Sequence, residues 1–194
     1  MLDLDLSTFS NLRTERLRLR EVCEEDCESL FALRNDDAVM EYIGSRKSNS
    51  LDEVMDLIRQ VHADRMNNKC VLWGLSLHDD PSLIGTIGFY RLQKENYRGE
   101  IGYLLDKQHW GKGLMGEALN AVVEFGFSKM GFHSIEAVTD PNNQRSIGLL
   151  LRHGFVQEGL FRENFFWNGR FYDSAVFSRL SFGSGNSDVK AQLT

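Results

Sequence analysis

The stretch QHWGKGLMGE, residues 108–117, decides how the rest of the chain is interpreted. Gly111, Gly113 and Gly116 lie between a β-rich segment and apolar residues at helical spacing. A glycine-rich turn that leads into a helix presents free backbone N–H groups and the positive end of the helix dipole, and both favour an anion such as a pyrophosphate. Glycine permits close backbone approach and positive φ angles, and Lys112 adds a positive charge. The stretch therefore predicts a phosphate-binding turn.

The spacing Gly111-x-Gly113-x-x-Gly116 also matches a dinucleotide-binding fingerprint, with Glu136 20 residues beyond the last glycine. Three features oppose that alternative. Residues 106–110 separate the predicted strand from the first glycine, the preceding strands predict an antiparallel meander, and only 78 residues follow Gly116. A turn that binds nothing is a second alternative, and an NAD(P)H titration would exclude an oxidoreductase.

Residue patterning places strands and helices on both sides of this turn. Before it, the pattern predicts a strand at 16–20, a helix at 24–34, a helix started by a Ser50–Glu53 capping box, and an antiparallel meander of strands at 71–77, 83–92 and 100–105. After it, the pattern predicts a helix at 114–130, a strand at 134–139, a helix at 146–153, and strands at 155–160 and 172–180 joined by an aromatic loop.

Length and composition limit the class of protein. A chain of 194 residues, 42% hydrophobic and 26% charged, suits one soluble domain that needs no disulfide or metal to hold its core. Seventeen glycines and two prolines exclude collagen-like and proline-rich disordered chains. The net charge of −6 argues against a nucleic-acid partner and favours cationic ones such as amines.

The setting is expected to be cytoplasmic. The start MLDLD lacks the basic and apolar regions of a signal peptide, and no apolar run reaches the ~20 residues of a membrane span. Cys23, Cys27 and Cys70 have no framework spacing, which indicates a reducing compartment. No histidine pair lies near Cys23 and Cys27 at ligand spacing, so no metal site is expected.

An ordered set of motifs resembles the GNAT acyltransferases, and more narrowly their RimJ/RimL-like branch. Gln108-x-x-Gly111-x-Gly113 resembles the acetyl-CoA motif Q/R-x-x-G-x-G/A of that family. The other matching pieces are TERL at 14–17, GEIGYL at 99–104, PNNQRS at 141–146, GFVQEG at 154–159 and Gly169-x-x-x-Asp173. The resemblance covers roughly residues 13–180 and implies an α/β (α+β) fold with a mixed, mostly antiparallel central sheet flanked by helices. It implies one acyltransferase domain at 13–180, after a lead-in at 1–12 and before a flexible tail at 181–194.

The resemblance implies transfer of an acetyl group from acetyl-CoA to a primary amine, either a peptide α-amine or a small-molecule amine, with no metal. A non-catalytic acyl-CoA-binding module on the same fold is the alternative. Cofactor contacts are expected from the backbone of Tyr103, Leu104 and Leu105, from the turn and helix start at Gln108, Gly111, Lys112, Gly113, Leu114, Met115 and Gly116, and from Asn143. Asn143 is also a natural helix cap, and the two roles are compatible.

The catalytic residues implied by the resemblance are Glu100 and Ser146. Glu100 is expected as the general base, through water, and Glu100→Gln is expected to lower kcat/KM by at least ~10²-fold; the alternative is an ion pair with a cross-strand Arg or Lys. Strand alternation places Glu100 with Leu104 and opposite Tyr103. Ser146 is expected to donate a proton to the departing thiolate. The helix at 146–153 carries no tyrosine that could do so.

The acceptor amine is expected where the first helices meet the last hairpin. Tyr42, Phe166 and Trp167 are the candidate contacts. The aromatic segment around Phe166 forms either the roof of the acceptor pocket or the surface of a homodimer. Nothing in the sequence identifies the acceptor, and neither a nucleic acid nor a membrane is expected as a partner.

Overall fold

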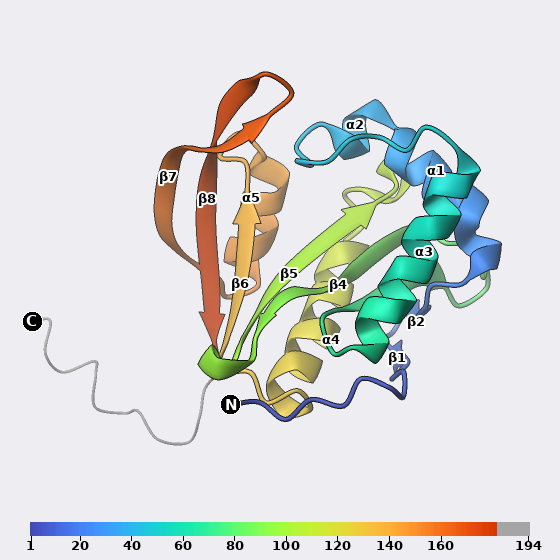
Figure 1. Cartoon of the computed structure of the whole chain (residues 1–194), viewed down its shortest axis with the longest axis horizontal. Helices are drawn as coiled ribbons and strands as arrows, with labels where there is room; N and C mark the ends of the chain where they lie inside the picture. Colours follow the sequence, from blue (N-terminus) through green and yellow to red (C-terminus); the bar gives the residue numbers. More distant parts are fainter. Residues whose placement is uncertain (182–194) are drawn as a thin grey trace, which may run out of the picture.

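A computed structural model describes residues 1–181, so the expected tail lies, apart from Ser181, outside the described residues. One sheet of eight strands runs through the molecule in the order β1-β2-β3-β4-β5-β6-β8-β7 (Figure 1). The strands are β1 (Leu12–Arg13), β2 (Leu17–Glu21), β3 (Val71–Leu77), β4 (Gly85–Gln93), β5 (Arg98–Leu105), β6 (Ser134–Thr139), β7 (Val156–Trp167) and β8 (Arg170–Leu180). The α-helices are α1 (Cys27–Asn35), α2 (Asp37–Met40), α3 (Leu51–Met66), α4 (Leu114–Ser128) and α5 (Gln144–Arg152). The expected mixed, mostly antiparallel sheet flanked by helices is confirmed.

The strands β5 and β6 pair in parallel, unlike their neighbours, and diverge early (Figure 1). Their register covers only Arg98–Glu100 of β5 against Ser134–Glu136 of β6. Beyond Glu100, the side of β5 that faces β6 therefore has no strand partner among the described residues. The helices α4 and α5 begin near this opening, so the divergence of two strands creates the space for a site.

Two hydrophobic clusters lie on opposite faces of the sheet. The larger one packs α4 against the strands and contains Trp73 and Phe89, which are fully buried and meet edge to face. The smaller one lies under α1 and α3. Leu2 of the lead-in is buried in the larger cluster, although residues 1–11 form no helix or strand. Among the described residues, no helix is long and apolar enough to cross a membrane.

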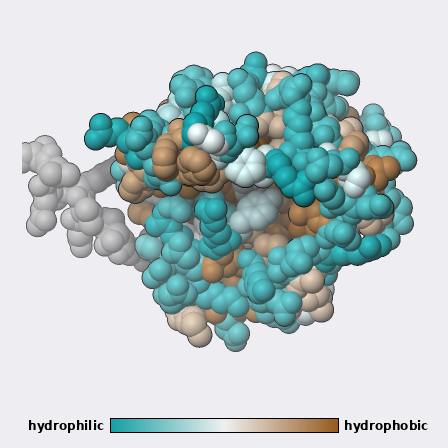
Figure 2. Space-filling model, turned by 45° about the horizontal axis from the view of Figure 1, so that its top comes forward, coloured by the Kyte–Doolittle hydropathy of each residue, from teal (hydrophilic) through white to brown (hydrophobic). Residues whose placement is uncertain are grey.

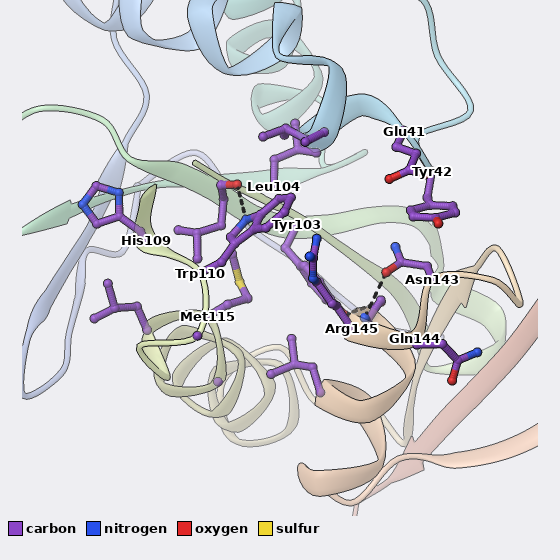
Figure 3. A pocket seen from close by; sticks show the side chains of 18 of the residues that line it. Glu41, Tyr42, Tyr103, Leu104, His109, Trp110, Met115, Asn143, Gln144 and Arg145 are labelled. Carbon is purple, nitrogen blue, oxygen red and sulfur yellow. Dashed lines mark hydrogen bonds between the residues drawn. The ribbon is translucent and has the colours of Figure 1, made fainter. Parts of the chain in front are cut away.

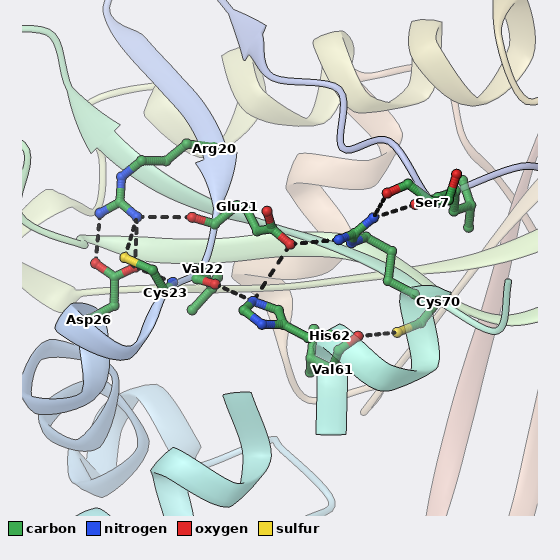
Figure 4. Close-up of polar contacts among 11 residues, drawn as sticks. Ser7, Arg20, Glu21, Val22, Cys23, Asp26, Val61, His62 and Cys70 are labelled. Atoms are coloured by element: carbon green, nitrogen blue, oxygen red, sulfur yellow. Dashed lines mark hydrogen bonds and ion pairs between the residues drawn. The ribbon is translucent and has the colours of Figure 1, made fainter. Parts of the chain in front are cut away.

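Polar contacts fasten the first helices to β2 (Figure 4). The guanidinium of Arg20 donates to both carboxylate oxygens of Asp26, each at 2.6 Å. Burial favours the protonated form of Asp26, but hydrogen bonds from Arg20 and from Cys23 N outweigh it, so the pKa of Asp26 lies below its usual value. On α3, Arg65 donates to Glu21 at 2.9 Å.

The expectation of an aromatic loop between the last two strands is wrong. β7 and β8 continue through this segment as a paired hairpin, with Phe165 opposite Tyr172 and Trp167 opposite Arg170. The turn consists of Asn168 and Gly169, both at positive φ, as in the turns that suit tight hairpins.

The capping box is only half present. Ser50 accepts a hydrogen bond from Glu53 N at 3.3 Å, but the Glu53 carboxylate accepts from Asn49 N at 3.0 Å. In a full capping box the Glu53 carboxylate would accept from Ser50 N, but here it accepts from the residue before the cap. The other predicted elements are present, with ends shifted by a few residues.

Candidate active site

A cavity of about 850 Å³ lies where β5 and β6 diverge (Figure 3). Its walls come from α2 and the loop after it, the end of β5, the turn before α4, the first turn of α4, and α5 from its first residue to its last. Figure 2 shows the molecule hollowed on its forward face, with apolar surface inside a largely hydrophilic rim. The cavity joins segments that are far apart in the sequence.

The glycine-rich turn has the geometry of an anion site. Gly111 and Gly113 have φ angles of +74° and +77°, and a Cβ at Gly111 would meet nothing within 4 Å. Gly113 is the N-cap of α4 and has no side chain to cap it, and no other side chain within residues 1–181 hydrogen-bonds to the first amides of this helix. The turn thus combines open space, free N–H donors and the helix dipole, which is what a diphosphate needs.

Close contact with a neighbouring side chain requires glycine at position 116. A Cβ there would lie 2.5 Å from His153 Nε2, so the absent side chain makes room for the imidazole of His153, the residue that caps the end of α5.

The segment that contains Arg16 holds the glycine-rich turn through hydrogen bonds. Its Nε donates to Glu117 Oε2 at 2.7 Å, and its Nη1 donates to the carbonyl of Lys112 at 2.9 Å. Thr14 also hydrogen-bonds Glu117. Burial raises and these bonds lower the pKa of Glu117, with a net decrease. Arg16 therefore supports the glycine-rich turn, a role that strand alternation could not indicate.

Most of the expected cofactor residues line the cavity. They are Tyr103, Leu104, Leu105, Gly111, Gly113, Leu114, Met115, Gly116 and Asn143. Gln108 and Lys112 do not line it. Lys112 is exposed, and its backbone carbonyl accepts the hydrogen bond from Arg16.

A contact that sequence reasoning missed joins two walls of the cavity. The guanidinium carbon of Arg145, on α5, lies 4.4 Å from the centre of the Trp110 ring. Trp110 also donates from Nε1 to the Leu105 carbonyl at 2.8 Å and lines the cavity. Arg152 adds a second positive charge to the α5 wall. The sequence did contain a signal for these two positive charges, namely Arg145 in the PNNQRS motif and Arg152 after it.

Asn143 and Ser146 lie together at the start of α5, and both line the cavity. Asn143 Oδ1 accepts a hydrogen bond from Ser146 N at 3.1 Å, which makes Asn143 the N-cap. Ser146 Oγ lies 2.7 Å from the hydroxyl oxygen of Tyr103. A tyrosine therefore reaches Ser146 from β5, although α5 carries none.

Glu100 is not brought to this cavity. It has the expected strand face, opposite Tyr103, but lines neither this cavity nor the smaller one beside it. Its carboxylate accepts a hydrogen bond from Arg91 Nη1 at 3.0 Å, which is the ion-pair alternative. Burial raises the pKa of Glu100, and Arg91 partly offsets that rise.

A second cavity, of about 390 Å³, adjoins the first, and the two share Glu41, Tyr42 and Asn142. The remaining walls are Asp140, Pro141, Glu163, Arg170, Phe171, Tyr172 and Asp173. Of the expected acceptor residues, Tyr42 therefore lines both cavities, while Phe166 and Trp167 line neither. Phe166 is 59% exposed and packs on Phe171, with ring centres 4.9 Å apart.

Within residues 1–181, no group of three or more His, Cys, Asp or Glu side chains is arranged to hold a metal ion. The three cysteines are free.

Comparison with known proteins connects this geometry to a family. Residues 16–156 match the family model described as "Acetyltransferase (GNAT) domain". The chain is 37% identical over 170 residues to the uncharacterized N-acetyltransferase YoaA of Bacillus subtilis (strain 168), covering 88% of this chain and 96% of the relative. It is 25% identical over 178 residues to the ribosomal-protein-serine acetyltransferase of Escherichia coli (strain K12), covering 86% and 94%.

The fold is shared with a solved structure, the microcin C7 self-immunity acetyltransferase MccE in complex with acetyl-CoA and AMP. The TM-score is 0.81 at 23% identity, and the match covers 92% of this chain and 100% of that one.

Proposed function

Because the chain belongs to the GNAT acetyltransferase family and is an acetyl-CoA-dependent N-acetyltransferase, we propose that it passes the acetyl group directly to a primary amine in a ternary complex. The observation that carries this proposal is a single cavity that joins the free helix start at Gly113 to the hydroxyl of Ser146. The first suits a diphosphate, and the second suits a departing thiolate.

Acetyl-CoA fits the residues present. The amides after Gly113 would hold the diphosphate, with Arg145 and Arg152 as nearby positive charges. The unpartnered side of β5 beyond Glu100 would hydrogen-bond the pantetheine arm as an added strand would. When bound, acetyl-CoA supplies the activated acetyl group.

The amine has to lose a proton before it attacks, because an α-amine has a pKa of ~8 and a lysine amine ~10.4. Glu100, with its raised pKa, is the base that the family resemblance implies. Glu41 is a second candidate, since it is the carboxylate that lines both cavities. Ser146 is the proposed donor of the proton that the leaving sulfur takes up.

The acceptor is proposed to enter through the second cavity. Glu41, Asp140, Glu163 and Asp173 contribute four carboxylates to its walls, against the single guanidinium of Arg170. This balance suits a primary amine that carries further positive charge, such as a polyamine or a peptide with a basic residue near its N-terminus. The ribosomal-protein-serine acetyltransferase among the relatives supports the peptide class.

A screen of amines with detection of released thiol tests the proposal. Polyamines, basic and acidic peptides with free N-termini, and amino sugars should be compared at equal concentration with saturating acetyl-CoA. We expect thiol release that depends on the acceptor and is larger for basic acceptors. Equal rates for acidic and basic peptides would contradict the proposed acceptor class.

The alternative of a non-catalytic acyl-CoA-binding module does not fit a chain that belongs to an acetyltransferase family and has relatives named as N-acetyltransferases. The ion pair between Arg91 and Glu100 bears instead on which carboxylate acts as the base.

A cytoplasmic homodimer completes the proposal. Free Cys23, Cys27 and Cys70 suit a reducing compartment. The hairpin exposes Phe161 and Phe166, at 58% and 59%, while its Phe171 and Tyr172 line the second cavity. The hairpin is thus proposed to serve both as a wall of the acceptor site and as a contact between copies, which light scattering would test.

A further inference from the structure

Two hydroxyl groups from distant parts of the chain meet at the wall of the larger cavity. Tyr103 lies on β5 and Ser146 in the first turn of α5, and both line the cavity. Their oxygens are 2.7 Å apart, within hydrogen-bonding distance. The contact bridges the two elements at the opening where β5 and β6 diverge.

Either hydroxyl could donate in this hydrogen bond, and the chemistry of the pair favours one direction. A phenol is a stronger acid than an aliphatic alcohol, so the Tyr103 O–H is the better donor and Ser146 Oγ the better acceptor. Burial raises the pKa of Tyr103 to about 12, and the bond with Ser146 opposes that rise. The phenol therefore keeps its proton at any pH at which the enzyme works.

The backbone of Ser146 is also held. Its N–H donates a hydrogen bond to Asn143 Oδ1 at 3.1 Å, and this bond orients the first turn of α5. With the Tyr103 hydroxyl donating to Oγ, the hydroxyl proton of Ser146 is directed away from Tyr103 and is available to the cavity.

We propose that Tyr103 is a positioning residue: its hydroxyl donates to Ser146 Oγ and so aims the Ser146 hydroxyl proton at the sulfur that leaves during acetyl transfer. The inference rests on the proposed function of the cavity. It assigns a role to the Tyr103 side chain, where the family resemblance implied only a backbone contact.

Atoms and charge balance in the transfer step. The acceptor nitrogen bonds to the acetyl carbon, the carbon–sulfur bond breaks, and its electron pair stays on sulfur. Sulfur takes the Ser146 hydroxyl proton. The acceptor amine gives one proton to its base before it attacks, and the second proton, which its nitrogen loses after the attack, returns to Ser146 through water. Tyr103 breaks no bond, and its O–H donates to Ser146 Oγ before and after the transfer.

The direct test is the pKa of the thiol of bound coenzyme A, which needs no acceptor. Thiolate absorbance is recorded against pH as the difference between the loaded and the free protein, for the wild type, Tyr103→Phe, Ser146→Ala and the double variant. A hydrogen bond to a charged atom corresponds to ~1–2 pKa units, so we expect Ser146→Ala to raise the thiol pKa by ~1 unit. Tyr103→Phe should raise it by about half as much, and the double variant no more than Ser146→Ala alone.

Tyr90→Phe is the matched control. Tyr90 is a half-buried tyrosine on the adjacent strand β4 that lines neither cavity, so the thiol pKa should stay at the wild-type value. In turnover, Tyr103→Phe should lower kcat ~10-fold and leave KM for acetyl-CoA within about twofold, because the phenol acts on the leaving step.

A wild-type thiol pKa in Tyr103→Phe, or effects of the two single variants that add in the double variant, would overturn the inference. The outcomes also separate it from the proposed function. If the wild type binds coenzyme A and the variants show the expected shifts of the thiol pKa, but the wild type transfers no acetyl group, only the proposed function is contradicted. Wild-type protein that does not bind coenzyme A would overturn both.

Discussion

Asn143 is one residue with two separable tasks. Its Oδ1 caps α5 by accepting the hydrogen bond from Ser146 N, while its Nδ2 has no hydrogen-bond partner among the described residues and lies at the cavity wall (Figure 3). Capping involves only the oxygen, whereas the proposed cofactor contact involves the amide group that faces the cavity. Substitutions that keep one atom and remove the other therefore distinguish the two tasks.

Asn143→Ala is predicted to lower the free energy of unfolding by about 1 kcal/mol through loss of the cap, and to weaken acetyl-CoA binding. Asn143→Asp keeps a capping oxygen, so we expect near wild-type stability with binding still weakened. Thermal unfolding and calorimetric titration provide the two readouts. Full acetyl-CoA affinity in Asn143→Asp would mean that Asn143 is only a cap.

The two candidate bases differ in where their carboxylates lie. Glu41 lines both cavities, and Glu100 is paired with Arg91 outside them. From this geometry we expect Glu41→Gln to lower kcat/KM by ~10²-fold. Glu100→Gln is the matched carboxylate substitution. If Glu100→Gln lowers kcat/KM by ~10²-fold and Glu41→Gln leaves it near the wild-type value, Glu100 is the general base.

At the scale of elements, the phosphate turn depends on backbone conformation more than on side chains. Gly111 and Gly169 offer a matched pair, because both have positive φ angles, of +74° and +84°, and open space where a Cβ would stand. Gly111 lines the larger cavity, and Gly169 lies in the β7–β8 turn and lines neither cavity.

Alanine at either glycine should destabilise the fold by about 1 kcal/mol through left-handed strain. Only Gly111→Ala should also weaken acetyl-CoA binding, by ~10-fold or more, because the added methyl group enters the space proposed for the diphosphate. Urea unfolding and fluorescence titration would measure the two effects. Equal acetyl-CoA affinities in the two variants would contradict an anion site at the turn.

The Arg20–Asp26 pair ties the first helical segment to β2 (Figure 4). Asp26 is buried, and Asp26→Asn is expected to lower the free energy of unfolding by about 2–3 kcal/mol, somewhat less than for a fully buried pair because Arg20 is partly exposed. Arg59→Ala, which breaks an exposed pair with Glu24, should change it little.

The pH dependence of this pair has a definite sign. Since the pKa of Asp26 is lowered by folding, its contribution is present above the unfolded value of ~3.9 and is lost as pH falls below it. Unfolding curves measured from pH 7 to pH 3 should therefore converge for wild type and Asp26→Asn at the acid end. A constant gap between the two proteins would contradict this account.

The sequence predicted the elements and the glycine-rich turn because both depend on local pattern: apolar periodicity, and glycines before a helix start. It missed the full length of the hairpin because the aromatic density at Phe165 and Phe166 outweighed the Asn168-Gly169 turn signal. Strand alternation gave the face of Glu100 correctly, yet what that face meets depends on Arg91 and on packing.

Contacts between distant elements could not be predicted for a related reason. Neither the Tyr103–Ser146 bond nor the Arg145–Trp110 contact follows from spacing along the chain.

At the scale of the whole molecule, two adjoining cavities share Glu41, Tyr42 and Asn142. In the proposed function, the larger cavity, where β5 diverges from β6, takes the acetyl donor, and the smaller one, lined by the β7–β8 hairpin, takes the amine acceptor. Such an arrangement lets the amine reach the acetyl group while both molecules are bound, with no acyl group carried by the protein.

The most direct measurement is intact mass spectrometry after incubation with isotopically labelled acetyl-CoA, with and without a basic amine acceptor. The account predicts that the labelled acetyl group appears on the acceptor, that its amount equals the thiol released, and that the mass of the protein itself stays unchanged in both mixtures. An acetylated protein that passes its label to the acceptor, or bound acetyl-CoA that leaves every acceptor unlabelled, would contradict direct transfer in a ternary complex.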